Sequence, residues 1–272
     1  MRLADYAWDL LASPSLEAKL RAAPEELTDE PELPCRDRAL ALRSPGRPAA
    51  LSFCSDRDKR QAFPKISELG DAEARARSLH FFANHELLAI EIVARALLVF
   101  PATPERRADL RATLRDEQRH LTLYINRMAE LGVEFGSVPV NDYIWQHARP
   151  LDDEKAFYAF FSLTLEGSNI DHASRYARRF EAHGDIESAK VMRCVLRDEI
   201  RHVRRGLDAF DDLRDPSEDL FDSFESALQW PMTPVRARGP EVDRAARRKA
   251  GMSDAFIDRV ARARRPSLDA RP

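Results

Sequence analysis

Residues 114–120 read Leu-Arg-Asp-Glu-Gln-Arg-His, and residues 196–202 read Leu-Arg-Asp-Glu-Ile-Arg-His. Each copy places a histidine three residues after a glutamate, as in Glu117 with His120 and Glu199 with His202. On a helix this spacing puts both side chains on one face, one turn apart. A carboxylate and an imidazole so placed can hold a metal ion, so the repeat predicts two helices that each supply two metal ligands.

Two alternatives compete with this interpretation. A single Glu-x-x-His could arise by chance in a chain that contains 46 acidic residues and 7 histidines. Two copies that agree at six of seven positions are much harder to explain by chance. The second alternative is a pair of charged, solvated helix faces, which the pattern of the surrounding sequence can test.

Four long stretches carry the periodicity of amphipathic helices, with apolar residues at alternating steps of three and four. We expect these helices over residues 71–100, 104–131, 152–183 and 185–213. In each helix one glutamate interrupts an otherwise apolar stripe: Glu86, Glu117, Glu166 and Glu199. A lone buried carboxylate is costly unless it is paired or bound to a cation. The interruptions therefore favour metal ligands over solvated faces.

The connections between these helices predict their arrangement. The first and second helices, and the third and fourth, are joined by short turns, whereas residues 133–151 form a long crossover. Ferritin-like bundles have this connectivity. A helix rises about 1.5 Å per residue, so the two glutamates of each antiparallel pair fall at nearly the same height. We therefore predict an all-α fold, a ferritin-like four-helix bundle with a dinuclear metal site.

The chain is expected to divide into three parts. Residues 1–70 should form a helical and extended segment that packs on the bundle. Residues 71–213 should form the bundle itself, and residues 214–272 a helical and irregular extension. The extension carries a basic tail, which we interpret as a solvated helix. Binding of nucleic acid or of an acidic partner is the less favoured alternative, because no aromatic residues interleave with the cations. The tail comprises Arg236, Arg238, Arg244, Arg247, Arg248, Lys249, Arg262, Arg264 and Arg265.

Residues next to the candidate ligands suggest supporting roles. A metal-bound histidine usually donates its other ring N–H to a carboxylate. We therefore expect Asp116 to reach His202 and Asp198 to reach His120, the alternative being that both acids lie on the surface. His80 is expected at the surface or as a cap. Four further residues lie off the apolar stripes and are interpreted as supporting or structural: His85, Glu91, Asp171 and His172.

Composition limits the class of protein. Apolar residues make up 44% of the chain, enough for a substantial core, and the net charge of −3 argues against a polyanion partner for the whole chain. The N-terminus lacks the pattern of a signal peptide, and no run of about 18 apolar residues could span a membrane. The three cysteines form no Cys-x-x-Cys motif and favour a reducing compartment. These features predict a cytoplasmic protein without a membrane partner.

Several stretches resemble the ferritin-like DUF455 family. They are 15–20 (Ser-Leu-Glu-Ala-Lys-Leu), 84–91 (Asn-His-Glu-Leu-Leu-Ala-Ile-Glu), 132–136 (Gly-Val-Glu-Phe-Gly), 165–171 (Leu-Glu-Gly-Ser-Asn-Ile-Asp), 184–189 (Gly-Asp-Ile-Glu-Ser-Ala) and the two repeats. The resemblance implies the ferritin-like fold and carries metal positions onto Glu86, Glu117, His120, Glu166, Glu199 and His202. It implies little about the reaction.

The ligand set is more distantly similar to that of di-iron oxygenases, of ribonucleotide reductase small subunits and of tRNA-hydroxylating enzymes. Tyr124 lies four residues after His120, an offset similar to that of the reductase's radical tyrosine. The favoured alternative is that Tyr124 is a core tyrosine one turn from the site.

The donor set favours two iron ions, with manganese or a mixed pair as alternatives, because carboxylates with imidazoles suit iron or manganese, whereas thiolates would favour zinc or iron–sulfur clusters. The first hypothesis is an O₂-activating oxidoreductase acting on an unknown substrate with an unknown electron donor. The second is iron handling, as a ferroxidase or storage protein, and the third is a structural metal site without O₂ chemistry. The oligomeric state stays open, and a homodimer is one candidate assembly.

Overall fold

The computed structural model describes residues 1–24, 26–29, 32–54 and 63–264. Within these ranges the chain forms helices and only isolated β-bridges, so the all-α prediction is confirmed. It divides into a first unit, Met1–Pro150 with Arg179–Val191, and a second unit, Leu151–Arg178 with Met192–Pro272. The three-part division expected from the sequence stays a prediction. None of the described helices has the length and apolarity needed to cross a membrane.

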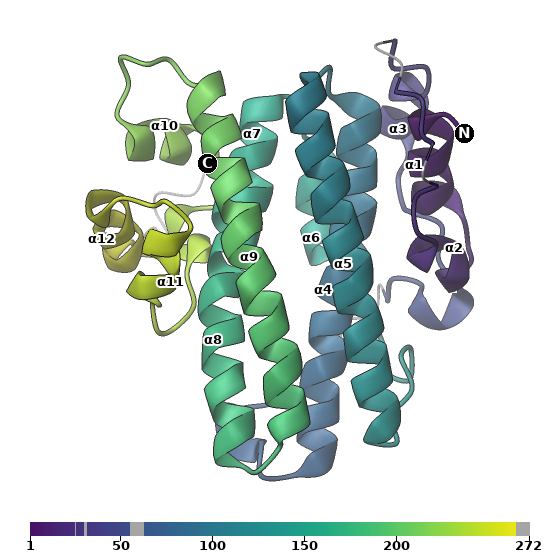
Figure 1. Cartoon of the computed structure of the whole chain (residues 1–272), viewed down its shortest axis with the longest axis vertical. Helices are drawn as coiled ribbons and strands as arrows, with labels where there is room; N and C mark the ends of the chain where they lie inside the picture. Colours follow the sequence, from purple (N-terminus) through teal and green to yellow (C-terminus); the bar gives the residue numbers. More distant parts are fainter. Residues whose placement is uncertain (25, 30–31, 55–62, 265–272) are drawn as a thin grey trace. The chain divides into compact units, whose positions relative to one another are not determined.

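The first unit is built on a hairpin of two long helices, α4 (Ala72–Val99) and α5 (Pro104–Glu130), which lie side by side (Figure 1). The side chain of Asp71 caps α4 by accepting a hydrogen bond from the Ala74 N–H at 3.0 Å. Thr103 caps α5 in the same way, and Pro104 occupies its first turn, where a missing N–H costs nothing. Local sequence thus fixes where both helices begin, close to the expected residues.

The N-terminal segment covers this hairpin with helices α1 (Leu3–Ala12), α2 (Leu16–Leu20) and α3 (Arg36–Ala41). Helices α1 and α3 pack on α4, and α2 packs on α5. The same segment contains two short 3₁₀-helices, η1 (Ala49–Leu51) and η2 (Ile66–Glu68), and neither these nor α3 was located by the sequence pattern. Segments this short complete too few turns to leave a readable periodicity.

A buried ion-pair network attaches the N-terminal segment to α4. Arg47 donates to both carboxylate oxygens of Glu91, with its shortest contact at 2.6 Å from Nη2 to Oε2. The Nζ atom of Lys19 lies 3.3 Å from Glu91 Oε1, and both of these side chains are fully buried. Arg47 also donates to Asn84 Oδ1 at 3.1 Å. Glu91 is therefore structural, as expected.

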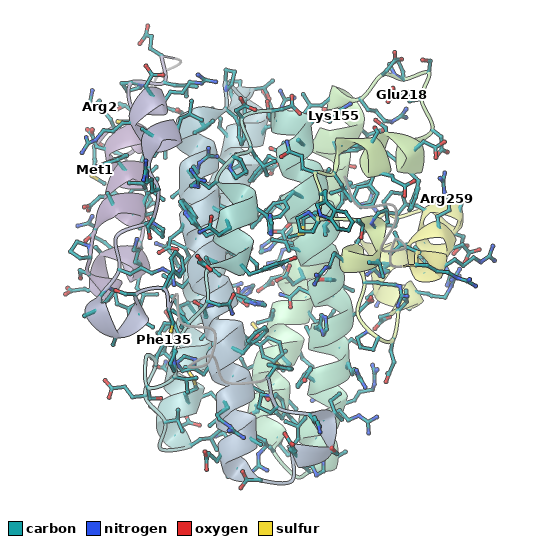
Figure 2. All side chains as sticks on the ribbon, turned by 180° about the vertical axis from the view of Figure 1, so that it is seen from behind. Met1, Arg2, Phe135, Lys155, Glu218 and Arg259 are labelled. Atoms are coloured by element: carbon teal, nitrogen blue, oxygen red, sulfur yellow. The ribbon has the colours of Figure 1, made fainter. Side chains whose placement is uncertain are left out.

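The crossover that follows α5 contains α6 (Tyr143–Ala148), which packs on α4. Its first part contacts His80, whose Nε2 accepts a hydrogen bond from the Gly136 N–H at 2.9 Å. The ring of Phe135, labelled in Figure 2, lies 5.2 Å from the His80 ring. The expected surface position of His80 is wrong, because the residue is 3% exposed and burial lowers its pKa to about 4. The neutral imidazole accepts the hydrogen bond from the Gly136 N–H.

In the second unit the helix expected over residues 152–183 consists of three consecutive segments: α7 (Glu154–Tyr158), the π-helix η3 (Ala159–Glu166) and α8 (Gly167–Ala182). The Gly167 N–H donates to the Ser162 carbonyl, five residues back. The Thr164 hydroxyl donates to the Ala159 carbonyl at 2.8 Å. The sequence periodicity, which was compared with the α-helical period of 3.6 residues, did not reveal this π-helix. The fourth long helix is α9 (Ile186–Leu213).

The C-terminal segment contains α10 (Leu220–Ala227), the 3₁₀-helix η4 (Pro234–Ala237), α11 (Arg244–Lys249) and α12 (Asp254–Arg262). Helices α10 and η4 pack against η3. The rings of Phe221, Phe224 and Phe256 lie 5.4 to 5.7 Å apart and join α10 to α12. Several described cations of the basic tail pair with acids of α12, as in Arg244 with Asp258 at 2.7 Å and Arg248 with Asp254 at 2.8 Å. Arg265 lies outside the described residues.

One member of the basic tail is a core residue. Arg247 is fully buried and contacts both oxygens of Asp171 on α8, at 3.1 Å from Nε and 2.8 Å from Nη2. Its Nη2 also donates to the carbonyls of Gly167 and Ala237. Asp171 further accepts the N–H of Gly239 at 2.9 Å. The interpretation of Arg247 as part of a solvated helix is therefore wrong, because a buried carboxylate on α8 holds it.

Asp185 ties the start of α9 to the hairpin of the first unit. Its Oδ1 caps α9 by accepting the Ser188 N–H at 3.0 Å. The guanidinium groups of Arg75 on α4 and Arg127 on α5 contact the same carboxylate at 3.0 and 2.8 Å. Burial alone would raise the pKa of Asp185, but the Ser188 hydrogen bonds and both arginines together lower it.

Replacing Arg247 tests the buried pair. Arg247→Met leaves the Asp171 carboxylate buried without its cation, so we expect the free energy of unfolding to fall by about 3–5 kcal/mol. Chemical denaturation followed by circular dichroism measures this loss. The matched control is Arg248→Ala. The Arg248 side chain is 54% exposed and pairs with Asp254, so its loss should lower the free energy of unfolding by about 0.5 kcal/mol or less. Equal effects of the two substitutions would contradict the structural role of Arg247.

Asp185→Ala should lower the free energy of unfolding at pH 7 by about 2–3 kcal/mol, because it removes a cap and two buried cation contacts. A carboxyl whose folded pKa is lowered stabilises the fold above its unfolded pKa of about 3.9. This contribution is lost as the pH falls through the lower folded pKa. Denaturation at several pH values between 7 and 3 should thus show wild type and variant converging at the acid end. The exposed Glu187→Ala serves as control, and a gap independent of pH would argue against an ionised Asp185.

Candidate metal centre

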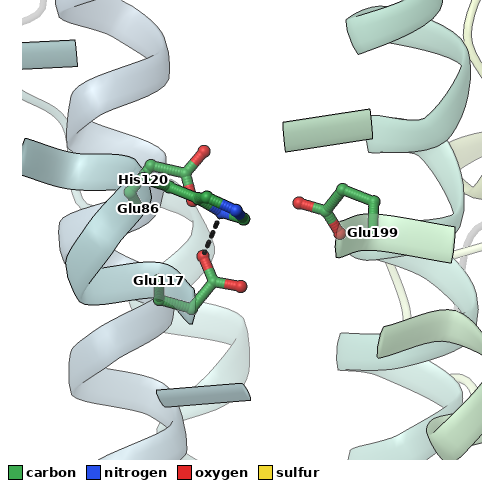
Figure 3. Close-up of side chains that lie close together, drawn as sticks. All are labelled: Glu86, Glu117, His120 and Glu199. Carbon is green, nitrogen blue, oxygen red and sulfur yellow. Dashed lines mark ion pairs between the residues drawn. The ribbon is translucent and has the colours of Figure 1, made fainter. Parts of the chain in front are cut away.

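The first cluster comprises Glu86 from α4 with Glu117 and His120 from α5, and Figure 3 shows these three side chains converging. The Nδ1 atom of His120 lies 3.6 Å from Glu86 Oε2 and 3.7 Å from Glu117 Oε2. All three side chains are at most 3% exposed. The hairpin of the first unit therefore assembles two carboxylates and one imidazole in a buried position.

The second cluster comprises Glu166, the last residue of η3, with Glu199 and His202 from α9. The Nδ1 atom of His202 lies 3.5 Å from Glu166 Oε1 and 3.7 Å from Glu199 Oε2. These side chains are buried as well. The second unit thus repeats the composition and the spacing of the first cluster, and within each unit the predicted ligands come together.

The distances from the histidine Nδ1 atoms to the carboxylate oxygens are compatible with a shared cation in each cluster. An N–H···O bond spans about 2.7–3.2 Å. Two ligand atoms that each lie about 2.1 Å from one metal ion are about 3.0–4.2 Å apart, depending on the angle between them. The observed 3.5 to 3.7 Å falls within that second range. The donor set of carboxylates and imidazoles also suits iron or manganese.

The electrostatics of the first cluster favour a bound cation. Burial raises the pKa of Glu86 well above its usual range, and the nearby Glu117 carboxylate raises it further, while His120 opposes both effects. Two buried carboxylates side by side are costly when both are charged. A divalent cation would balance both charges, so the residues of this cluster fit a metal ion.

The histidine orientation identifies which ring nitrogen faces the carboxylates. In both clusters it is Nδ1, so Nε2 lies on the other side of the ring. The expected bonds from Asp116 and Asp198 would have to reach that atom. Within its own unit Asp116 pairs with Arg119 at 2.9 Å, and Asp198 pairs with Arg201 at 2.6 Å. The contacts of these two acids with the opposite histidines stay predictions.

One functional residue was missed by the sequence reasoning. The amide of Asn169 on α8 donates a hydrogen bond to Glu199 Oε1 at 2.6 Å. A signal existed, because Asn169 lies three residues after Glu166 and hence on the same face of its helix. The corresponding residue of the first hairpin, three positions after Glu86, is Ala89, which has no side-chain donor.

The residues one turn away from the clusters also differ. In the first unit the buried rings of Phe82 and Tyr124 stack with their centroids 6.0 Å apart. Tyr124 is a core residue in this packing, and its redox role stays a prediction. The corresponding positions in the second unit are Ser162 and Gly206. A Cβ atom at Gly206 would lie 2.0 Å from the Ser162 Cβ, so only glycine permits this approach of α9 to η3.

Comparison with known proteins identifies the family of this chain. The chain matches the family described as "Protein of unknown function (DUF455)" over residues 11–258, which include both clusters and both buried arginine pairs. No curated protein and no solved structure matches it. Because the match extends over most of the sequence, the chain belongs to the DUF455 family.

Proposed function

We propose that the protein binds two iron ions through its two clusters and activates O₂ to oxidise an organic substrate. The observation that carries this proposal is the duplication of the cluster. Each copy takes one glutamate from one helix and a Glu-x-x-His pair from the next helix. The imidazole-to-carboxylate distances are 3.6 and 3.7 Å in one copy and 3.5 and 3.7 Å in the other. Two unrelated acidic helix faces would not be expected to repeat the same imidazole-to-carboxylate distances.

The proposal includes a ferritin-like arrangement in which the two hairpins pack together with their clusters facing each other. It is supported by the connectivity of two short turns and one long crossover, and by the sequence register, which predicts nearly the same height for the two glutamates of each hairpin. Four carboxylates and two imidazoles would then hold both metal ions. When bound there, two adjacent ferrous ions would supply two electrons to O₂.

The chain's own residues bind and shield these metals. The four glutamates provide hard oxygen donors, and the two histidines hold Nδ1 toward them. Because the pKa of Glu86 is raised, this side chain favours its protonated form without metal and releases the proton when a cation binds. Burial of all six ligands excludes bulk water from the reacting centre.

The terminal segments favour an oxidoreductase over an iron store. Arg47 of the N-terminal segment is held by Glu91, five residues after Glu86 on α4. Arg247 of the C-terminal segment is held by Asp171, five residues after Glu166. Both segments are therefore anchored to the helices that carry the ligands. A storage bundle does not need such covers, whereas an enzyme that must shape a substrate pocket does.

Anaerobic iron loading followed by O₂ tests the proposal. Metal-free protein should take up two ferrous ions per chain, because each cluster offers a complete set of donors. Mixing with O₂ should then give a transient absorption in the near-ultraviolet and visible range. Glu117→Ala and Glu199→Ala should each bind less iron and lose the transient. Glu130→Ala on α5, where the side chain is 61% exposed, and Glu187→Ala on α9 are the matched controls and should behave as wild type.

The other outcomes separate the alternatives. Uptake of many irons per chain would favour iron storage. Two bound metals without any reaction with O₂ would favour a structural or manganese site. Absence of bound metal in a folded wild-type protein would overturn the proposal.

A further inference from the structure

A small pocket lies between α4 and the crossover. Its volume is about 60 Å³, several times the roughly 10–15 Å³ that one water molecule needs. Its walls come from the N-terminal segment, from α4 and from residues 138–141 of the crossover, all within the first unit. The aromatic and polar part of the lining consists of Phe63, Arg77, His80, Phe81, Asn84 and Asn141.

Hydrogen bonds hold the walls of this pocket together. The Gly136 N–H of the crossover donates to His80 Nε2 on α4 at 2.9 Å. The Cys54 N–H of the N-terminal segment donates to the Val140 carbonyl at 2.9 Å. These contacts join three segments that are distant in the sequence, so the pocket belongs to the folded structure and needs no ligand to form.

Arg77 is the cation of this pocket, and the described lining gives it no counter-charge. Its Nε atom is buried, and the part of the chain that the structure describes offers that atom no hydrogen-bond partner. No aspartate or glutamate stands among the described residues that line the pocket. The buried guanidinium groups of Arg47 and Arg247, by contrast, each contact a carboxylate. A buried donor without a partner costs free energy, which a bound anion would offset.

The other polar groups of the lining favour an anion as well. Asn84 is 2% exposed, and its Oδ1 accepts a hydrogen bond from Arg47 at 3.1 Å. The amide NH₂ group is therefore the part of this side chain that can donate to a ligand. His80 stays neutral at pH 7, because burial lowers its pKa to about 4. The positive charge of the lining thus comes from Arg77.

Aromatic rings supply the apolar part of the lining. The ring centroids of Phe63 and Phe81 lie 4.5 Å apart, and Phe63 is 36% exposed. The ring of Phe81 also lies 4.2 Å from the ring of His85. A flat apolar ligand can pack against the two phenylalanine rings while its charged end pairs with Arg77.

The pocket is separate from the candidate metal centre. Arg77, Phe81 and Asn84 follow each other at steps of four and three residues and share one face of α4. Asn84 precedes Glu86 by two residues, so at about 100° per residue the two side chains lie about 160° apart around the helix. A small ligand in the pocket therefore does not contact the first cluster, and its binding does not require a metal ion.

We propose that this pocket is a binding site for a small aromatic carboxylate. Arg77 pairs with the carboxylate group, and Phe63 and Phe81 pack against the ring. A planar guanidinium matches a carboxylate through two parallel hydrogen bonds, and the Asn84 amide supplies a further donor. This site goes beyond the proposed iron chemistry and does not depend on it.

Titration with para-fluorobenzoate, followed by fluorine nuclear magnetic resonance, tests this site. Wild type should bind para-fluorobenzoate with the same affinity in the presence and in the absence of Mn²⁺. The neutral para-fluorobenzamide has the same ring but no charge, so it should bind at least about tenfold more weakly. Inorganic phosphate, which has charge but no ring, should also bind more weakly and is measured by its competition with para-fluorobenzoate.

Three variants assign the binding to this pocket. Arg77→Met removes the guanidinium and should weaken para-fluorobenzoate binding at least about tenfold. It should not lower the melting temperature, because it removes a buried donor that has no partner among the described residues. Phe63→Leu removes one ring and should weaken binding about 2- to 10-fold. The matched control is Arg111→Met, which changes a half-buried arginine of α5 outside the pocket and should bind as wild type does.

Several results would overturn this inference. They are failure of folded wild type to bind para-fluorobenzoate at millimolar concentration, equal binding of para-fluorobenzamide, and an unchanged titration of the folded Arg77→Met variant. Tighter binding of inorganic phosphate than of para-fluorobenzoate would also overturn it, by assigning the pocket to a simple anion. A protein that binds no iron would overturn the proposed function and leave these outcomes unaffected.

Discussion

A carboxylate buried in a helical core needs a cation, and this requirement organises the protein. Eight acidic residues on the long helices are buried. Four of them pair with guanidinium groups of the chain itself: Glu91 with Arg47, Asp171 with Arg247, Asp116 with Arg119 and Asp198 with Arg201. The other four are Glu86, Glu117, Glu166 and Glu199, and each has an imidazole as its neighbour. An imidazole is at most a weak substitute for a fixed positive charge, which leaves a metal ion as the natural complement.

The carboxylates that pair with arginine and the carboxylates of the clusters lie on different sides of the same helices. Glu91 follows Glu86 by five residues, and Asp171 follows Glu166 by five. At about 100° per residue, this offset turns the second carboxylate about 140° away from the first. Each of these helices therefore presents one acid to a candidate metal and another to a terminal segment. Assembly of the site and attachment of its covering segments thus depend on the same two helices.

The two units are alike in their candidate ligands and unlike in the residues beside them. In the second unit the Asn169 amide donates to Glu199, and Gly206 leaves room for the Ser162 side chain. In the first unit the stacked rings of Phe82 and Tyr124 occupy the corresponding positions.

The sequence by itself indicated four long helical stretches and the residues that cluster on them, but not the π-helix in the third stretch. Helix periodicity, the capping side chains of Asp71 and Thr103 and the repeated heptapeptide are all local features of the sequence. Only the tertiary structure decided which distant cation neutralises which buried acid. Arg247 reads as one more member of a basic tail, and Asn169 as an ordinary helix residue, until folding brings them to Asp171 and Glu199. The physical reason is that a helix period reports which face of a helix is apolar, whereas burial of a single charge depends on partners from segments far away in the sequence.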